Sequence, residues 1–259
     1  MTKIIAVHSY KGGTGKTSIS VNLAATFAKN GKKVCLFDLD FRAPSLFAIL
    51  KAQNVEYWLN DYLNNTCEIN TALIDMSDKI SGNGKFYTCL ANPSTEAIRD
   101  ISSKDRKWEM RALGRLLAFR ESLLRDQKFD YLVFDTSPGL QYSSINAIVA
   151  ADFVVVATTG DRSDVDGTKR MLAELYNLFE KKTGLVLNKV LDPSATSRKT
   201  EMANKIKADY QVPLLGIVPC FCEVLRAQGN LIFVQDKEDH PFTKIVAEMA
   251  NKIENNEIN

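Results

Sequence analysis

The sequence predicts an α/β fold, a doubly wound, mainly parallel sheet flanked by helices. Two observations carry this prediction. Short runs rich in Val, Ile, Leu and Phe alternate with stretches in which apolar residues recur at helical spacing, which is the order of βαβ units. Most of the runs are continuously apolar rather than alternating, as strands buried on both faces require.

The expected elements follow from these patterns in chain order. The expected strands are Ile4–His8, Val34–Leu39, Phe86–Ala91, Tyr131–Asp135, Phe153–Thr158, Leu185–Asn188 and Leu214–Val218. The expected helices are Ser18–Lys29, Lys104–Arg125, Val165–Lys181, Ser197–Tyr210 and Phe242–Ile253. Residues 53–85 are polar and Asn-rich, and we read them as a variable excursion from the sheet. The whole chain, 1–259, is expected to be a single domain.

Composition bounds the class of protein. Hydrophobic residues make up 45% and charged residues 25% of the chain, as in ordinary globular proteins. The net charge of +2 gives no overall field that would favour nucleic acid or a membrane surface. No apolar run is long enough for a membrane span, and the N-terminus does not resemble a signal peptide. With five cysteines, an odd number, we expect free thiols and a cytoplasmic location.

A glycine-rich segment, Lys11-Gly-Gly-Thr-Gly-Lys-Thr17, separates the first expected strand from the first expected helix. Glycines let successive backbone N–H groups face phosphate oxygens, and the helix N-terminus adds partial positive charge. This is the context of a P-loop, in which Lys16 contacts the β- and γ-phosphates and Thr17 ligates Mg²⁺. The expected nucleotide-binding residues are Gly12, Gly13, Thr14, Gly15, Lys16, Thr17 and Ser18.

Two features distinguish this loop from the common Gly-x-x-x-x-Gly-Lys-Thr form: Tyr10 replaces the first glycine, and Lys11 precedes the paired glycines. The loop resembles the deviant Walker A motif of the ParA/MinD-type ATPases, a class that also includes nitrogenase iron protein and arsenite-pump ATPases. In these families the extra lysine crosses a dimer interface to reach the ATP of the second subunit. The resemblance therefore implies a catalytic Lys11 and an ATP-bound sandwich dimer. The alternative is a solvated loop lysine.

Asp38 and Asp40 lie at the end of the expected strand Val34–Leu39. Open α/β sheets bind ligands outside the carboxyl ends of their strands, and residues i and i+2 of an extended chain point to the same side. This suits one carboxylate that holds Mg²⁺ through water, assigned to Asp38, and another that orients the attacking water. The segment Asp38–Ser45 resembles switch I of the ParA/MinD family, which implies the second role for Asp40. Acidic residues also form ordinary turns at strand ends.

Asp135 follows the apolar run Tyr131-Leu-Val-Phe, the pattern of a Walker B strand. Its carboxylate is expected to accept a water ligand of Mg²⁺. The segment Asp135-Thr-Ser-Pro-Gly139 resembles switch II of the same family, which implies that its Pro-Gly backbone approaches the γ-phosphate.

Asn188 and Pro219 are the expected contacts of the nucleotide base. Asn188 ends an apolar strand, and its amide can both donate and accept at a purine edge. Pro219 lies in Gly216-Ile-Val-Pro219-Cys-Phe-Cys-Glu223, which resembles the next base-site element of the family. Asn is also a routine turn residue, so the choice of ATP over GTP is what the resemblance implies.

The motifs follow the order of the family along nearly the whole chain, residues 53–103 excepted. The resemblance implies an ATP-hydrolysing molecular switch that uses ATP and Mg²⁺ and is a homodimer when ATP is bound. It also implies slow turnover until a protein activator engages, and a role in positioning or partitioning a cellular cargo.

Two further segments are relevant to whether the protein binds DNA or a membrane. Basic residues on or near one expected helix could hold DNA phosphates or form a solvated helix face: Arg198, Lys199, Lys205 and Lys207. The stretch Glu254–Asn259 is acidic and polar, which disfavours membrane binding through a basic C-terminal helix of the MinD type.

Two other functions fit parts of the sequence. The first is an iron–sulfur scaffold or carrier of the related ATPase branch, but Cys220-Phe-Cys222 is too close for the usual Cys-x-x-Cys spacing. The second is a phosphotransferase like the bacterial tyrosine kinases, which carry a C-terminal tyrosine cluster; this chain has no tyrosine after Tyr210.

Overall fold

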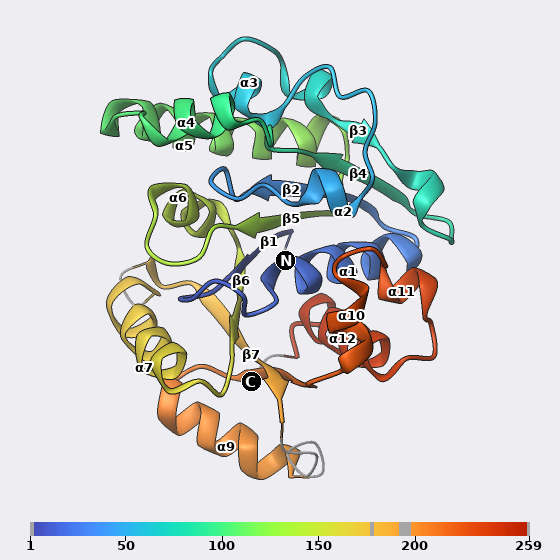
Figure 1. The fold of residues 1–259 in the computed structure, drawn as a ribbon, viewed down its shortest axis with the longest axis vertical. Coiled ribbons are helices and arrows are strands. Elements are labelled where there is room, and N and C mark those ends of the chain that lie inside the picture. Colours follow the sequence, from blue (N-terminus) through green and yellow to red (C-terminus); the bar gives the residue numbers. More distant parts are fainter. Residues whose placement is uncertain (1–2, 177–178, 192–197, 258–259) are drawn as a thin grey trace.

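The centre of the molecule is an eight-stranded sheet, seen in a computed structural model that describes residues 3–176, 179–191 and 198–257 (Figure 1). The strand order is β3-β4-β2-β5-β1-β6-β7-β8, and every neighbouring pair is parallel except β3 and β4. The doubly wound, mainly parallel sheet predicted from the sequence is therefore confirmed. The strands are β1 (Ile4–His8), β2 (Lys33–Leu39), β3 (Ile74–Asp75), β4 (Lys85–Cys89), β5 (Tyr131–Thr136), β6 (Phe153–Thr158), β7 (Lys182–Val190) and β8 (Leu214–Pro219).

Helices connect these strands. They are α1 (Lys16–Lys29), α2 (Leu46–Ile49), α3 (Leu59–Leu63), α4 (Thr95–Ser102), α5 (Arg106–Glu121), α6 (Tyr142–Ala150), α7 (Arg162–Met171), α9 (Lys199–Tyr210), α10 (Cys222–Ala227), α11 (Phe233–Asp236) and α12 (Pro241–Glu254). Short 3-10 turns lie at Ile69–Ala72 and Ser77–Lys79, and π-helical turns at Ser122–Asp126 and Leu172–Tyr176 extend α5 and α7. None of the helices in the described ranges is long and apolar enough to cross a membrane.

Parts of three predictions cannot be compared with the structure. Residues 177–178 of the expected helix Val165–Lys181, residue 197 of the expected helix Ser197–Tyr210 and residues 258–259 of the C-terminal stretch lie outside the described residues.

The sheet is buried on both faces, which explains its continuously apolar strands. Within β1, Ile4 and Ala6 join the core under α5, α6, α7 and α9, whereas Ile5 and Val7 join the core under α1, α11 and α12. Figure 1 shows these two groups of helices on opposite sides of the strands. This packing fixes the carboxyl ends of β1, β2 and β5 side by side, since each pairs in register with its neighbour.

Residues 53–85 differ from the sequence prediction. Part of this segment returns to the sheet as β3, which pairs antiparallel with β4. Its scattered apolar side chains are buried rather than solvated, among them Leu59, Tyr62, Leu63, Ile69 and Met76. They lie on short turns, so they show neither the period of a helix nor that of a strand, and the pattern analysis did not detect them.

Gly84 packs against the backbone of the last turn of α1 and of the residues just after it. A Cβ at this position would lie 2.0 Å from the carbonyl oxygen of Ala28 and 2.5 Å from that of Lys32, and neither backbone atom can move aside cheaply. We expect Gly84→Ala to lower the free energy of unfolding by about 3 kcal/mol in urea denaturation. The control is Gly114→Ala in α5, where nothing lies within 4 Å of the new Cβ; a gain of about 1 kcal/mol is expected. Equal stability of the two variants would contradict this packing.

Candidate nucleotide site

The P-loop joins the end of β1 to the start of α1. Gly13 and Gly15 have φ angles of +79° and +92°, the left-handed region that favours glycine. Gly15 is the N-cap of α1 and no side chain caps it. A Cβ on Gly15 would lie 2.3 Å from Asn188 Nδ2, so glycine also admits the close approach of that amide. The first turn of α1 is thus open to an anionic ligand, as phosphate-binding loops require.

Lys16, Thr17, Ser20 and Asp135 meet at the start of α1. Lys16 and Asp135 are both buried, at 7% and 1% exposure. Ser20 Oγ lies 2.9 Å from Asp135 Oδ1, and the Thr17 hydroxyl also donates to this carboxylate. The structure therefore brings together the two residues predicted to hold Mg²⁺ from α1 and β5, beside the predicted phosphate-binding lysine.

The electrostatic surroundings of Asp135 suit a residue that binds a cation. Burial raises the pKa of its carboxyl to about 6, against hydrogen bonds from Thr17 and Ser20 and the charge of Lys16, which lower it. Because burial makes ionisation of this carboxyl costly, a nearby positive ion stabilises its ionised form. The described residues hold no group of three or more His, Cys, Asp or Glu able to bind a metal. Mg²⁺ typically takes one or two protein oxygens and completes its shell with phosphates and water, so Thr17 and Asp135 fit it.

Asp38 is fully buried, and it organises the chain that follows β2. Its Oδ1 accepts a hydrogen bond from Asp40 N at 3.1 Å, and its Oδ2 accepts from Ser45 N at 3.2 Å and Leu46 N at 3.1 Å. Burial and the neighbouring Asp135 raise the pKa of this carboxyl well above its usual range. Both oxygens of the predicted metal residue thus already accept backbone hydrogen bonds within the protein.

Asp40 links this loop to the segment after β5. Its Oδ1 accepts from Ser137 Oγ at 3.0 Å and from Ala43 N at 3.2 Å. Asp40 is partly exposed, in contrast to the buried Asp38. The two segments that resemble switch I and switch II are therefore joined by a direct side-chain contact.

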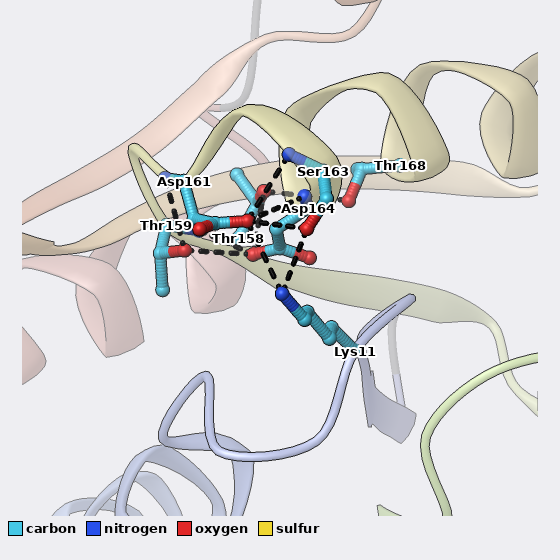
Figure 2. Close-up of polar contacts among 7 residues, drawn as sticks. All are labelled: Lys11, Thr158, Thr159, Asp161, Ser163, Asp164 and Thr168. Atoms are coloured by element: carbon cyan, nitrogen blue, oxygen red, sulfur yellow. Dashed lines mark hydrogen bonds and ion pairs between the residues drawn. The ribbon is translucent and has the colours of Figure 1, made fainter.

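Lys11 points to the start of α7 rather than to its own P-loop (Figure 2). Its Nζ lies 3.2 Å from Asp161 Oδ1 and 2.7 Å from Ser163 Oγ. Asp161 also caps α7 by accepting from Ser163 N and Asp164 N. Hydrogen bonds from Ser163 and then from Lys11 lower the pKa of Asp161 to about 2. Half of the Lys11 side chain is exposed, so this ion pair lies at the surface.

Asn188 and Lys189 brace the P-loop from the end of β7. Asn188 Nδ2 donates to Thr14 O at 2.7 Å, and its Oδ1 accepts from Lys189 N. Lys189 Nζ donates to Gly13 O at 2.6 Å. Each polar atom of the predicted base-reading amide therefore already has a protein partner, which leaves one N–H and one lone pair for a ligand.

A cavity of about 330 Å³ adjoins the P-loop. It is lined by predicted site residues and by apolar side chains, and it has the size of a small-ligand site. The predicted residues on its wall are Gly15, Thr17, Ser18, Asn188 and Pro219. Cys220 and Phe221 follow Pro219 along the same wall, so one residue of the Cys220/Cys222 pair borders this cavity.

Several residues of the site were not predicted from the sequence. Ser20 stands one helical turn after Lys16, a spacing that points it at the same neighbours, and this is a signal that could have been used. Ser137 lies within the switch II-like segment Asp135–Gly139, but its contact with Asp40 comes only through the fold, as do the contacts of Asp161 and Ser163 with Lys11.

The basic residues proposed for DNA lie around α9, at the lower end of the view in Figure 1. Arg198 lies 4.0 Å from Glu201, while Lys205 and Lys207 are exposed. The side chain of Lys199 lies outside the described residues. DNA binding stays a prediction.

Comparison with known proteins agrees with this geometry. A family model described as "AAA domain" matches residues 2–192. The septum site-determining protein MinD of Synechocystis sp. is 31% identical over 220 residues, covering 85% of this chain and 76% of that protein.

Two solved structures share the fold. The MinD of Pyrococcus horikoshii complexed with Mg-ADP superposes with a TM-score of 0.74 at 22% identity, covering 98% of this chain and 96% of that one. A putative plasmid partition protein of Borrelia burgdorferi bound to AMPPNP gives a TM-score of 0.76 at 19% identity and covers 100% of both chains. The chain therefore belongs to the ParA/MinD family of P-loop ATPases.

Proposed function

We propose that this protein is an ATP-driven molecular switch that binds Mg-ATP at the P-loop and pairs with a second copy across the surface that carries Lys11. It then hydrolyses ATP slowly until a protein activator engages, and it works as a single domain that positions or partitions a cargo. The observation that carries the proposal is the combination of an intact phosphate site with a half-exposed lysine, Lys11, that turns away from that site. The MinD and plasmid-partition names of its relatives support the class of job.

Nucleotide binding is assigned to the P-loop and its cavity. Gly12 to Thr17 would surround the phosphates with backbone N–H groups, and Lys16 would neutralise them. Thr17 and Asp135 would hold Mg²⁺, which supplies positive charge where phosphate charge develops. Asp38, which was predicted from the sequence to hold Mg²⁺, would instead act indirectly by shaping the loop of Asp40, because its oxygens accept three backbone N–H groups. Asn188 and the backbone at Pro219 would border the base.

Lys11 is assigned to the paired state. An exposed ion pair contributes little stability, so Asp161 can release the Lys11 ammonium at small cost. A second copy that carries Mg-ATP offers it a far stronger partner in the terminal phosphate. Pairing would then depend on the nucleotide, as a switch requires.

Phosphate release tests the activity. The wild-type protein is expected to release inorganic phosphate from Mg-ATP at a low rate without any added acceptor. Lys16→Ala is the matched control and should release none above background. Transfer of phosphate to protein or to a small acceptor, in place of release, would instead favour the phosphotransferase reading.

Metal binding should depend on pH through Asp135. Its folded pKa of about 6 lies above the usual value of 3.8, so below about pH 6 a proton competes with the cation. We expect the Kd for Mg²⁺ in the presence of ADP to rise about tenfold for each pH unit below 6 and to level off above about pH 7. By the same linkage the protein without ligand loses stability as pH rises from about 4 to about 6.

Isothermal titration with Mg²⁺ between pH 5 and pH 8 measures this dependence. Asp135→Asn removes the titrating group and leaves only the titration of ADP itself, which serves as the reference. A wild-type profile that matches the Asp135→Asn profile would show that Asp135 does not hold the metal.

A further inference from the structure

His8 is the last residue of β1, just before the P-loop in the chain, and it is fully buried. Its Nε2 lies 2.9 Å from the carbonyl oxygen of Gly139, in the segment after β5. A carbonyl oxygen only accepts, so the imidazole proton of this contact is on Nε2. Burial lowers the pKa of His8 to about 4, and the charge of Lys16 lowers it further against the Gly139 hydrogen bond. The ring is therefore a neutral donor at physiological pH.

The two peptide groups of Gly139 are held by different partners. Its N–H donates to Ser9 O at 2.9 Å, whereas its carbonyl accepts from His8. The φ angle of Gly139 is +75°, which glycine adopts freely. Because the φ and ψ torsions of Gly139 lie between these two peptide groups, one group can turn while the other stays fixed.

The segment that ends at Gly139 touches both the P-loop and Asp40. The Cγ of Pro138 lies 3.9 Å from where a Cβ on Gly12 would be. Ser137 Oγ donates to Asp40 Oδ1 at 3.0 Å, and Ser144 Oγ holds the carbonyl of Ser137 at 2.7 Å. Pro138 thus joins the peptide that carries the Gly139 N–H to Ser137, whose hydroxyl contacts Asp40.

We propose that His8 is a positioning residue for hydrolysis, the fixed pivot about which the segment from Ser137 to Gly139 turns when nucleotide binds. This inference rests on the proposed function. Without nucleotide, the Gly139 N–H is satisfied by the neutral carbonyl of Ser9. A terminal phosphate in the P-loop is a stronger, charged acceptor for the same N–H. His8 keeps the Gly139 carbonyl in place during this exchange. The movement of the Gly139 N–H therefore shifts Ser137 and Asp40 and does not spread into the loop that follows Gly139.

A pair of amide substitutions separates this role from simple packing. The terminal nitrogen of His8→Gln can replace Nε2 as the donor to Gly139, whereas the shorter side chain of His8→Asn does not reach. For His8→Asn we expect kcat for phosphate release to fall about tenfold, the value of one buried hydrogen bond, with the Kd for Mg-ADP within about twofold of wild type. His8→Gln should stay within about threefold of wild type in both quantities.

Three results would overturn the proposal: a wild-type kcat for His8→Asn, an equal loss in both variants, or a loss matched by weaker ADP binding. Failure of the proposed function is seen separately, as absence of phosphate release by the wild-type protein.

A second measurement needs neither a variant nor turnover. The chain has only two histidines, His8 and His240, so ¹⁵N spectra of the imidazoles are readily assigned. We expect His8 to keep a neutral ring protonated on Nε2, with unchanged shifts, before and after addition of Mg-AMPPNP, while the backbone amide of Gly139 moves. A His8 ring that changes tautomer or shift with the nucleotide would contradict a fixed pivot, and so would a Gly139 amide that stays still.

Discussion

Lys11→Ala is expected to abolish ATP-dependent pairing and to lower kcat by about a thousandfold, the scale of a cationic group that completes a phosphate site in trans. The Kd for Mg-ATP of the monomer should change little, because Lys11 in the unpaired chain contacts Asp161 and Ser163 rather than the P-loop. Light scattering measures the pairing, phosphate release measures kcat, and titration calorimetry measures binding.

The matched control is Asp161→Asn. It weakens the same contact within the subunit but leaves the lysine in place, so pairing should persist and set in at an equal or lower ATP concentration. If Lys11→Ala pairs and hydrolyses ATP normally, the inter-subunit role is wrong and Lys11 is a surface lysine. If Asp161→Asn behaves like Lys11→Ala, the contact with α7 is what matters, not the lysine in trans.

Asp40→Ala is expected to lower kcat by a factor between about a hundred and ten thousand, the range for loss of a positioned general base or water-orienting group. ATP binding should be retained, because Asp40 lies outside the P-loop and contacts Ser137 and Ala43. ATP that is bound but not cleaved should hold the protein in its paired state. Quenched-flow measurement of phosphate in a single turnover tests the chemical step directly.

Asp40→Asn separates chemistry from packing. The amide oxygen can still accept from Ser137 and Ala43, so a purely structural role would leave this variant active. A carboxylate that orients water would leave it as slow as Asp40→Ala. Loss of ATP or Mg²⁺ binding in either variant would move Asp40 into the metal site instead.

The fold was predictable for the strands that are buried on both faces of the sheet. Ile4–His8 and Phe153–Thr158 were predicted to the residue, because central strands must be apolar throughout. The segment of β3 was not, since two residues paired at an edge leave no periodic pattern. Ile69 and Met76 near it are buried in two different cores, through contacts with distant segments that no local window contains.

The residues of the candidate site also fall into two groups, those that a local motif predicts and those that only the fold brings together. The P-loop and Asp135 were predicted because each belongs to a motif of contiguous residues. The contact of Lys11 with Asp161 joins positions 150 residues apart, and that of His8 with Gly139 joins positions 131 apart, so only the fold reveals them. Asn188 was predicted to contact the nucleotide base, and that stays a prediction; its hydrogen bond to Thr14 was not predicted.

The molar mass of Asp40→Ala in solution, with and without Mg-ATP, tests the proposed switch most directly. We expect a monomer in buffer or Mg-ADP and a dimer in Mg-ATP, with Lys11→Ala placed in the same background remaining a monomer throughout. A protein that binds Mg-ATP by calorimetry yet stays a monomer at every nucleotide condition would contradict the switch and leave an ordinary P-loop ATPase.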